Sequence, residues 1–411
     1  MEIRACKWKL RYHNGERRSA DMRIRQLTKE EAAERVALSE FAFQLELTEQ
    51  QREERKTRFR PEEQWGAFDD EGKLLSALHL APLEIYIGQR SLKMGGVAGV
   101  ATWPEARRHG CVAKLLAHAL EVMRGQGQTV SMLHPFSFPF YRKYGWEMTI
   151  ERKQYEIESK QLPAIEGFAG QVVRIPKEAS ALNGVYERFA RRYTGMLKRS
   201  EEWWEQRALS KPGLAALYRN GDGTPEGYIL YDVRNRLMTV HEWAALTEEA
   251  RRGLWSFVAN HDSMADKIAM TVPVDDATSF WFADPRFKQE IIPYFMSRIV
   301  DAAGFVAQYP FLPGSADEAL TITLIDRHAP WNNGTFRLEW DRDGTARLQQ
   351  TERQSAGAGI ACDIQTLTAL LLGNRRPEQM ARWGRLQGDG EAVSVLERRV
   401  PSLTPYLADF F

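Results

Sequence analysis

A short basic segment precedes an amphipathic stretch, and its residue types suit the binding of an anion. Residues 107–112 read RRHGCV and follow the apolar segment VAGVATW. The first N–H groups of a helix lack intrahelical acceptors, and the helix dipole adds partial positive charge there. Gly110 lets the backbone approach a ligand, and Arg107 and Arg108 supply donors that match phosphate. The segment therefore indicates a pyrophosphate cradle; an ordinary surface helix start is the alternative.

The elements that would position this segment follow from the spacing of apolar residues. One helical face is formed by Val112, Leu115, Leu116, Ala119, Leu120 and Met123. Before it, residues 65–103 contain apolar segments separated by DDEG and GQR turns, which is typical of antiparallel strands. Residues 22–43 predict a strand and an amphipathic helix, because Thr28 and Glu31 match a capping box. Residues 129–135, TVSMLHP, predict a further strand.

A second and weaker copy of this order follows. GYILYDV and RLMTVHEWAAL predict strands, TEEARRGLWSFVANH a helix and DKIAMTVPV another strand. Thr247 with Glu248 and Glu249 indicates an ordinary capped helix start, so this copy lacks the basic turn. The pattern changes again near Ile291. Residues 292–311 predict a helix, and alternating strands with NNG and DRDG turns and the helix IQTLTALLLGN come after it.

Composition excludes several classes of protein. Among 411 residues, Lys plus Arg number 56 and Asp plus Glu 55, and a net charge of +1 argues against a general nucleic-acid binder. No apolar run reaches the ~20 residues that span a bilayer, and the N-terminus lacks an apolar signal core, so we expect a cytoplasmic protein without membrane association. Cys6, Cys111 and Cys362 form no CxxC pair, and no HExxH occurs; we expect neither disulfides nor a metal site.

Four segments together resemble a known family. They are the RRHG segment, LHPFSFPFYRKYGWE, PWNNGTF and PYLADFF. They are similar to the enhanced-intracellular-survival (Eis) branch of the GNAT acetyltransferase superfamily, and the resemblance extends from Met22 to Phe411. It implies an α/β fold with mixed sheets: tandem GNAT domains followed by a sterol-carrier-protein-like α+β domain. The expected parts are an N-terminal extension (1–21), a catalytic GNAT domain (22–157), a degenerate central GNAT domain (158–290) and the sterol-carrier-like domain (291–411).

The resemblance also implies which residues bind acetyl-CoA. The pantetheine arm would meet the backbone of Val100, Ala101 and Thr102. The phosphates would meet Arg108, His109, Gly110, Cys111, Val112 and Ala113. A further contact falls on Phe136 and Ser137. One departure from the family pattern is Val112, where Gly or Ala is common.

For the chemical step, the resemblance assigns Tyr141 as general acid and the terminal carboxylate of Phe411 as general base. The chemistry is reasonable, because an amine must lose a proton and a departing thiolate must gain one. Packing is the alternative for Tyr141, and we expect Tyr144 to have a packing role. Two aromatic residues after PYL favour docking of the C-terminus over fraying. We interpret Asp409 as a solvated acidic residue, and a role in binding a cationic substrate is the alternative. Cys111 as an acetylated nucleophile and His109 as a base are weaker alternatives.

The sequence thus predicts a cytoplasmic, acetyl-CoA-dependent N-acetyltransferase acting on small primary amines of the aminoglycoside or lysine type. Its central domain, with an ordinary helix start, should bind no acetyl-CoA. By resemblance the protein would be a homo-oligomer, a hexamer in mycobacterial relatives. The rival hypothesis is a non-catalytic carrier that binds an apolar ligand through its C-terminal domain.

Overall fold

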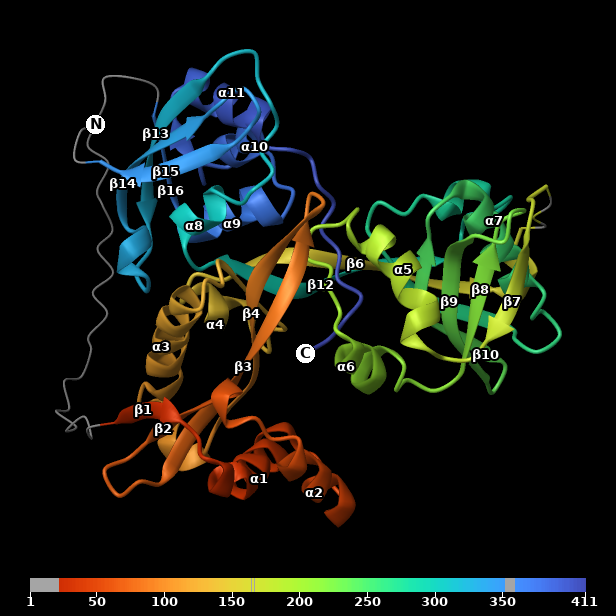
Figure 1. Ribbon diagram of the computed structural model, residues 1–411, viewed down its shortest axis with the longest axis horizontal. Coiled ribbons are helices and arrows are strands. Elements are labelled where there is room, and N and C mark those ends of the chain that lie inside the picture. Colours follow the sequence, from red (N-terminus) through yellow and green to blue (C-terminus); the bar gives the residue numbers. More distant parts are fainter. Residues whose placement is uncertain (1–21, 164, 166, 352–358) are drawn as a thin grey trace, which may run out of the picture. The chain divides into compact units, whose positions relative to one another are not determined.

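The computed structural model describes residues 22–163, 165, 167–351 and 359–411. The predicted extension, residues 1–21, lies outside the described residues, and so does Cys6. The described chain forms two compact units (Figure 1): an N-terminal unit of residues 22–78 and 100–115, and a main unit of residues 79–99 and 116–411.

The N-terminal unit is built on strands whose core faces carry apolar side chains. Its elements are β1 (Arg23–Gln26), α1 (Ala32–Phe43), α2 (Glu49–Thr57), β2 (Gln64–Phe68) and the first residues of β3 (Leu74–Ile87). β1 pairs antiparallel with β2, and Leu27, Leu38 and Phe68 share one core. The capping box is confirmed, since the Thr28 amide donates to Glu31 Oε2 at 2.8 Å.

The main unit contains one long mixed sheet. Its order is β3-β4-β5-β12-β6-β11-β10-β9-β8-β7, and β3 contributes its residues from His79 onward. The strands are β4 (Arg90–Thr102, its first ten residues in this unit), β5 (Val130–Leu133), β6 (Glu147–Glu158), β7 (Gln171–Ile175), β8 (Leu214–Arg219), β9 (Pro225–Arg234), β10 (Leu237–Ala245), β11 (Lys267–Val272) and β12 (Lys288–Ile299). β6 pairs with β12 on one side and with β11 on the other, so it joins the two predicted copies into one sheet.

Helices lie between these strands, and two of them, α3 and α7, fall where the sequence predicts a helix. They are α3 (Cys111–Gly125), α4 (Phe138–Arg142), α5 (Ala179–Ala190), α6 (Glu201–Trp203) and α7 (Glu248–Ala259). The predicted apolar face of α3 is buried, as Leu116, Leu120 and Met123 illustrate. The capped start of α7 is also confirmed, because the Ala250 amide donates to Thr247 Oγ1 at 3.1 Å.

The prediction of a helix over residues 292–311 is wrong. Residues up to Ile299 form β12, which lies between β5 and β6, and only α8 (Ala302–Val306) is helical. The last five residues of β12, 295–299, are all buried. A strand segment that is buried on both faces lacks alternation, and periodicity alone cannot separate it from a buried helix.

A second sheet of order β15-β14-β13-β16-β17 forms the C-terminal part of the main unit. Its elements are β13 (Glu318–Ile325), β14 (Gly334–Trp340), β15 (Ala346–Gln350), β16 (Gly359–Asp363), α9 (Ile364–Leu372), α10 (Pro377–Arg382), β17 (Gln387–Gly388) and α11 (Gly390–Arg399). The predicted limits at 157/158 and 290/291 fall inside β6 and β12, and the domain limits stay a prediction.

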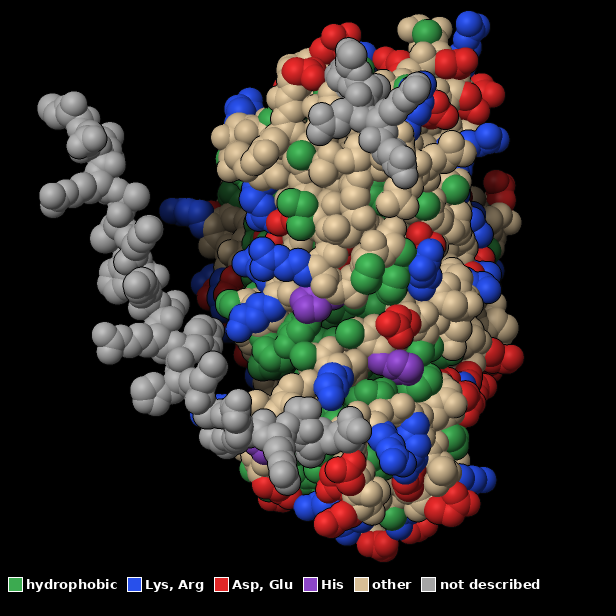
Figure 2. Space-filling model, turned by 90° about the vertical axis from the view of Figure 1, so that its left-hand side faces the viewer, with side chains coloured by type: hydrophobic (Ala, Val, Ile, Leu, Met, Phe, Trp, Pro, Cys, Tyr) green, Lys and Arg blue, Asp and Glu red, His purple; other side chains and the backbone are tan. Residues whose placement is uncertain are grey.

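The mixed α/β class is therefore confirmed by both sheets. Within the described ranges, none of the helices combines the length and the apolar character that crossing a membrane requires. Basic and acidic side chains are both spread over the face drawn in Figure 2, in keeping with the net charge of +1.

Candidate active site

The basic turn between β4 and α3 has an unusual backbone. Arg108 has a φ of +68° and Gly110 a φ of +84°. A left-handed conformation costs a residue other than glycine about 1–2 kcal/mol, so the turn holds Arg108 against its preference. Arg107, Arg108 and His109 are all exposed. The turn thus presents basic side chains to solvent in a strained loop, which is common where a loop binds a ligand.

Free amides follow this turn directly. The first helical bond of α3 runs from the Lys114 amide to the Gly110 carbonyl at 3.1 Å. The amides of Cys111, Val112 and Ala113 precede it, and they therefore have no acceptor within the helix. A Cβ atom added to Gly110 would meet nothing within 4 Å. The space beside Gly110 is therefore open, and amides without helical acceptors at such a turn suit the binding of a pyrophosphate.

Cys111 is not placed as a nucleophile. Its side chain is 2% exposed, and its thiol donates to the Ala106 carbonyl at 3.5 Å. Burial raises the pKa of this thiol above its ordinary value, which disfavours the reactive thiolate. The geometry therefore argues against the acetyl-cysteine alternative.

The end of β4 carries the residues predicted to meet the pantetheine arm. Ala101 is buried, while Val100 and Thr102 are half-buried. Ser76 Oγ lies 2.7 Å from the Ala101 carbonyl, to which it donates, and 2.7 Å from Thr102 Oγ1. Ser76 therefore fixes this end of β4, a role that the sequence analysis missed.

β4 and β5 separate part-way along their length. They pair in parallel only up to Gly96 and Met132, although β4 continues to Thr102. Gly99 has a φ of +56° inside the strand, which marks a local irregularity of the bulge type. In the sequence, the glycines of the GGVAG run could have indicated this irregularity, because glycine inside a strand pattern often marks a bulge.

Tyr141 lies on the short helix α4. Its side chain is 3% exposed and its hydroxyl makes no hydrogen bond to any residue that the structure describes. Burial raises the pKa of Tyr141 to about 12, so the phenol keeps its proton at neutral pH. The ring contacts Phe136, Phe140 and Trp146, with centroids 5.5, 5.2 and 6.4 Å away.

The other two residues predicted on this segment differ in exposure and role. Phe136 is 74% exposed, so its ring is accessible to a ligand. Ser137 caps α4, because its Oγ accepts from the Phe140 amide at 3.4 Å. Ser137 thus has a structural partner in addition to its predicted contact with acetyl-CoA.

Phe411 is docked onto the large sheet. Its ring lies 4.9 Å from the ring of Phe295 and 6.3 Å from that of Trp203. A Cβ atom on Gly96 would come within 2.9 Å of the Phe411 ring and 3.0 Å of Leu83. The expected docking of the C-terminus is therefore confirmed, and it occurs beside the last residue pair of β4 and β5.

The backbone before Phe411 is held at several points. The Thr194 amide donates to the Thr404 carbonyl at 2.9 Å. Arg152 Nη2 donates to the Leu407 carbonyl at 2.7 Å, and the Tyr294 hydroxyl donates to the Asp409 carbonyl at 2.8 Å. These contacts fix the backbone of the segment that leads to the α-carboxylate.

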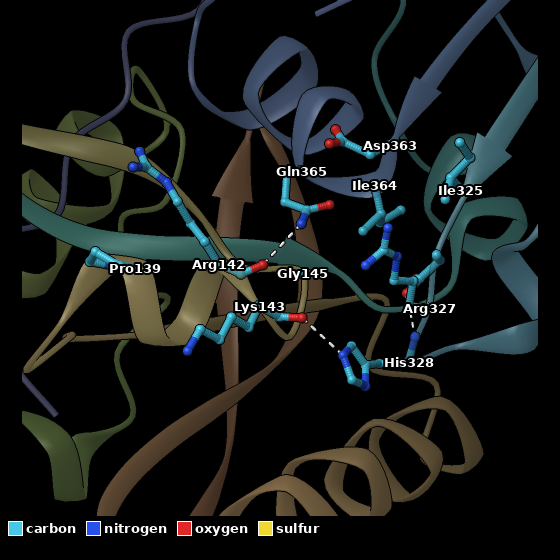
Figure 3. Close-up of a pocket in the computed structure, with 11 residues that line it drawn as sticks. Pro139, Arg142, Lys143, Gly145, Ile325, Arg327, His328, Asp363, Ile364 and Gln365 are labelled. Atoms are coloured by element: carbon cyan, nitrogen blue, oxygen red, sulfur yellow. Dashed lines mark hydrogen bonds between the residues drawn. The ribbon is translucent and has the colours of Figure 1, made fainter. Parts of the chain in front are cut away.

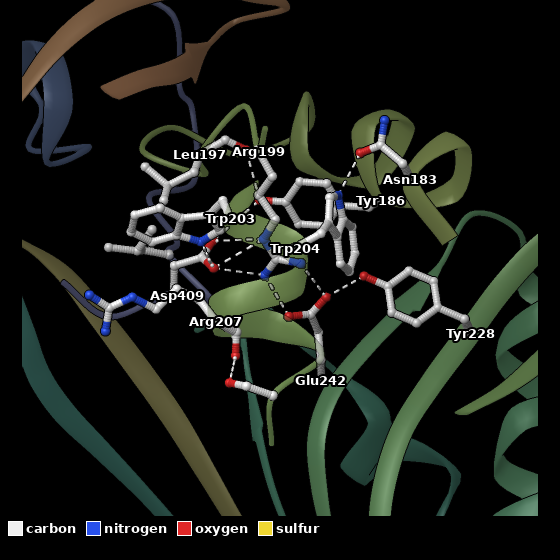
Figure 4. Close-up of polar contacts among 12 residues, drawn as sticks. Asn183, Tyr186, Leu197, Arg199, Trp203, Trp204, Arg207, Tyr228, Glu242 and Asp409 are labelled. Atoms are coloured by element: carbon white, nitrogen blue, oxygen red, sulfur yellow. Dashed lines mark hydrogen bonds and ion pairs between the residues drawn. The ribbon is translucent and has the colours of Figure 1, made fainter. Parts of the chain in front are cut away.

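Asp409 is the strongest of these anchors, so its interpretation as a solvated residue is wrong. It is 5% exposed, and its carboxylate accepts from Arg199 Nε at 3.0 Å and Trp203 Nε1 at 2.9 Å. Arg199 also donates to both oxygens of Glu242, at 2.8 and 2.6 Å, and Tyr228 donates to the same carboxylate (Figure 4). Burial alone would raise the pKa of Glu242, but Arg199 lowers it. The sequence carries no local signal for this network, because Arg199, Glu242 and Asp409 are far apart in the chain.

The predicted residues therefore fall in two sets. The N-terminal unit holds the end of β4 and the turn with its amides, and the main unit holds the α4 segment and Phe411. On the main unit, His134 adds an imidazole whose centroid lies 5.1 Å from the Phe410 ring. Partial desolvation by its neighbours, and then the charge of Arg152, lower the pKa of this histidine.

Known families match three consecutive parts of the chain. Residues 23–149 match an acetyltransferase (GNAT) domain, residues 195–299 match a second acetyltransferase (GNAT) domain model, and residues 302–408 match a sterol carrier protein domain. These matches confirm the predicted order of two GNAT domains followed by a sterol-carrier-like domain.

Similar proteins align with this chain over most of its length. An uncharacterized N-acetyltransferase of Streptomyces avermitilis is 24% identical over 425 residues, covering 96% of this chain and all of that protein. The N-acetyltransferase Eis of Mycobacterium tuberculosis is 25% identical over 347 residues, which cover 79% of this chain and 82% of Eis.

Solved structures agree. A probable N-acyltransferase of Enterococcus faecalis superposes with a TM-score of 0.86 at 29% identity, covering 95% of this chain and 100% of that one. Eis1 of Mycobacterium abscessus has the same fold, with a TM-score of 0.78 at 20% identity and coverage of 95% and 100%. The protein is therefore a GNAT N-acetyltransferase of the Eis-like family, with two GNAT domains and a sterol-carrier-type C-terminal domain.

Proposed function

We propose that the protein transfers an acetyl group directly from acetyl-CoA to a primary amine. The GNAT family implies an acyl-CoA donor, and the free amides after Gly110 fit the pyrophosphate of such a donor. Tyr141 acts as general acid and the α-carboxylate of Phe411 as general base. The acceptor is a small cationic amine of the aminoglycoside or lysine type.

The observation that carries this proposal is the docking of Phe411. Its ring packs on Gly96, beside the place where β4 and β5 part. Buried contacts of Asp409 and the Arg152 bond to Leu407 hold the preceding backbone. Terminal residues are usually poorly ordered unless they are tied down. These anchors hold the segment that carries the Phe411 carboxylate in place, as a general base that must stay within hydrogen-bond reach of the amine requires.

The proposed reaction proceeds in one displacement. The Phe411 carboxylate accepts a proton from the ammonium group of the acceptor, directly or through water, and the free amine attacks the thioester carbonyl. The carbon–sulfur bond breaks and the electron pair leaves with sulfur. The Tyr141 hydroxyl supplies the proton that converts the leaving thiolate to the thiol of CoA, and its raised pKa keeps that proton available at neutral pH. The second proton that the acetylated nitrogen must lose passes through water to the phenolate and restores the acid, and the Phe411 carboxylate releases its proton to solvent.

The test is release of the CoA thiol from acetyl-CoA with a panel of amines. We expect turnover with primary amines that carry several charges, including an aminoglycoside and a lysine peptide, and none with quaternary ammonium compounds. A protein that binds acetyl-CoA but releases no thiol with any amine would contradict the proposal. Binding of an apolar ligand by that same protein would favour the carrier hypothesis.

A further inference from the structure

The backbone directly after Tyr141 is held by side chains from distant parts of the chain. The carbonyls of residues 142–144 each accept a hydrogen bond from a different side chain. Gln365 Nε2 donates to the first at 2.9 Å, His328 Nε2 contacts the second at 2.9 Å, and Arg298 Nη1 donates to the third at 2.7 Å. Figure 3 shows the bonds from Gln365 and His328 converging on this turn. A carbonyl accepts only, so His328 carries its proton on Nε2.

All three donors depend on the C-terminal domain. Gln365 lies in the first turn of α9, and His328 follows β13. Arg298 comes from β12, but its guanidinium is held by the Asp326 carboxylate at 2.9 and 2.8 Å. Asp326 is 3% exposed and also accepts from Asn332 Nδ2 at 3.0 Å. The third bond is therefore fixed from the same domain as the other two.

Gly145 makes this arrangement possible. It has a φ of +94°, and a Cβ atom at this position would lie 1.4 Å from Arg298 Nη1. The side chain of Arg298 is fully buried, and its guanidinium lies 5.4 Å from the centre of the Trp146 ring. The turn thus combines a left-handed glycine with a buried cation that occupies the place of its missing side chain.

Such support matters because α4 has only five residues. A helix of this length is not stable by itself, and the last carbonyls of any helix lack intrahelical donors. Ser137 caps its first turn, and the three side chains hold its last residue and the two residues that follow it. A cation at a helix C-terminus also interacts favourably with the helix dipole. Both ends of the element that carries Tyr141 are therefore fixed.

We infer that the sterol-carrier-type domain serves catalysis as a frame that positions Tyr141. Gln365 and His328 are positioning residues, and the Arg298–Asp326 pair is a third contact of the same kind. This inference rests on the proposed role of Tyr141 as general acid. It gives the C-terminal domain a role in acetyl transfer that needs no ligand in that domain.

The test combines two positioning variants with a change of Tyr141 itself. Gln365→Met and His328→Leu remove the N–H donors, and both positions are half-buried, so the fold should tolerate them. We expect the double variant to lose about tenfold or more in kcat, because a displacement of about 1 Å can cost a hundredfold. The KM for acetyl-CoA should stay within about twofold. His328→Gln keeps an N–H donor. In a protein that retains Gln365, this variant should keep kcat within about threefold of the parent protein.

The decisive comparison repeats the double variant with Tyr141→Phe. If the contacts act through the phenol, the loss should disappear once the phenol is gone. Equal fractional losses in both backgrounds, or full kcat in the double variant, would overturn the inference. Full kcat in Tyr141→Phe alone would instead overturn the acid role, and with it the inference. The control is Arg398→Gln, which breaks the ion pair with Glu318 at the opposite end of β13 and should leave kcat unchanged.

Discussion

Gly110→Asp should weaken the binding of acetyl-CoA without harming the fold. A Cβ atom at Gly110 meets nothing within 4 Å, so the new side chain has room. The φ of +84° disfavours most side chains, but Asp and Asn tolerate this region. An Asp before the first helical residue also caps a helix well, which offsets part of the conformational cost.

The size of the effect follows from charge. The new carboxylate would stand beside the amides of residues 111–113, where we place the pyrophosphate. At about 5 Å and an effective dielectric constant of about 20, one pair of like charges costs about 3 kcal/mol. Solvent and salt reduce this figure at an exposed turn, so we expect at least about 1.4 kcal/mol, a tenfold rise in Kd. The carboxylate can also accept bonds from the amides itself, which adds to the loss.

Calorimetric titration with acetyl-CoA measures the effect, and Gly110→Asn is the matched control. Asn has the same shape and the same tolerance of the left-handed region, but it carries no charge. We expect the Asn variant to bind several times more weakly than the parent, and the Asp variant at least ten times more weakly than Asn at low salt. Equal Kd values for Asp and Asn would refute the assignment of this turn to phosphate.

Three further predictions follow from the main unit. Gly145→Ala should destabilise the protein by about 2–4 kcal/mol in denaturant unfolding, because its methyl group would occupy the position of Arg298 Nη1; wild-type stability would contradict this packing. Asp409→Asn should lower both Tm and kcat, because Arg199 loses one of its two buried carboxylates, and the expected loss of stability is about 1–3 kcal/mol. An unchanged kcat would show that this anchor does not contribute to the reaction. Burial raises the pKa of Tyr141 to about 12, so deprotonation of Tyr141 should cause no loss of kcat at any pH up to about 10. A fall of kcat near pH 8 that disappears in Tyr141→Phe would contradict that value.

Local signals in the sequence predicted local structure well. The capping box of Thr28, the apolar face of α3 and the capped start of α7 depend on residues within a few positions of each other, and all are confirmed. The family resemblance supplied the identity of each domain, and their order agrees with the repeated pattern and with its change near Ile291. β12 was mistaken for a helix because its last five residues, 295–299, are all buried and show no alternation that would reveal a strand.

Contacts between distant segments could not be predicted. Asp409 looks like a surface residue until Arg199 and Glu242 are brought beside it, 210 and 167 positions earlier in the chain. The donors to residues 142–144 come from β12, the loop after β13 and α9, and the sequence gives no indication that these segments meet. Burial and pairing of polar groups are properties of the tertiary fold, so a single sequence without an alignment does not reveal them.

The central claim is that the α-carboxylate of Phe411 takes the proton of the amine, and one added residue tests it directly. A single Gly after Phe411 turns that carboxylate into a neutral amide and moves the new charge by about 3.3–3.6 Å. General-base catalysis contributes about 10²–10⁴-fold, so the extended protein should bind acetyl-CoA normally and lose about a hundredfold or more in kcat. Phe411→Leu, which keeps the carboxylate and an apolar anchor, should lose far less. Full kcat in the extended protein at several pH values would contradict the claim and direct the search for a base to His134 and His109.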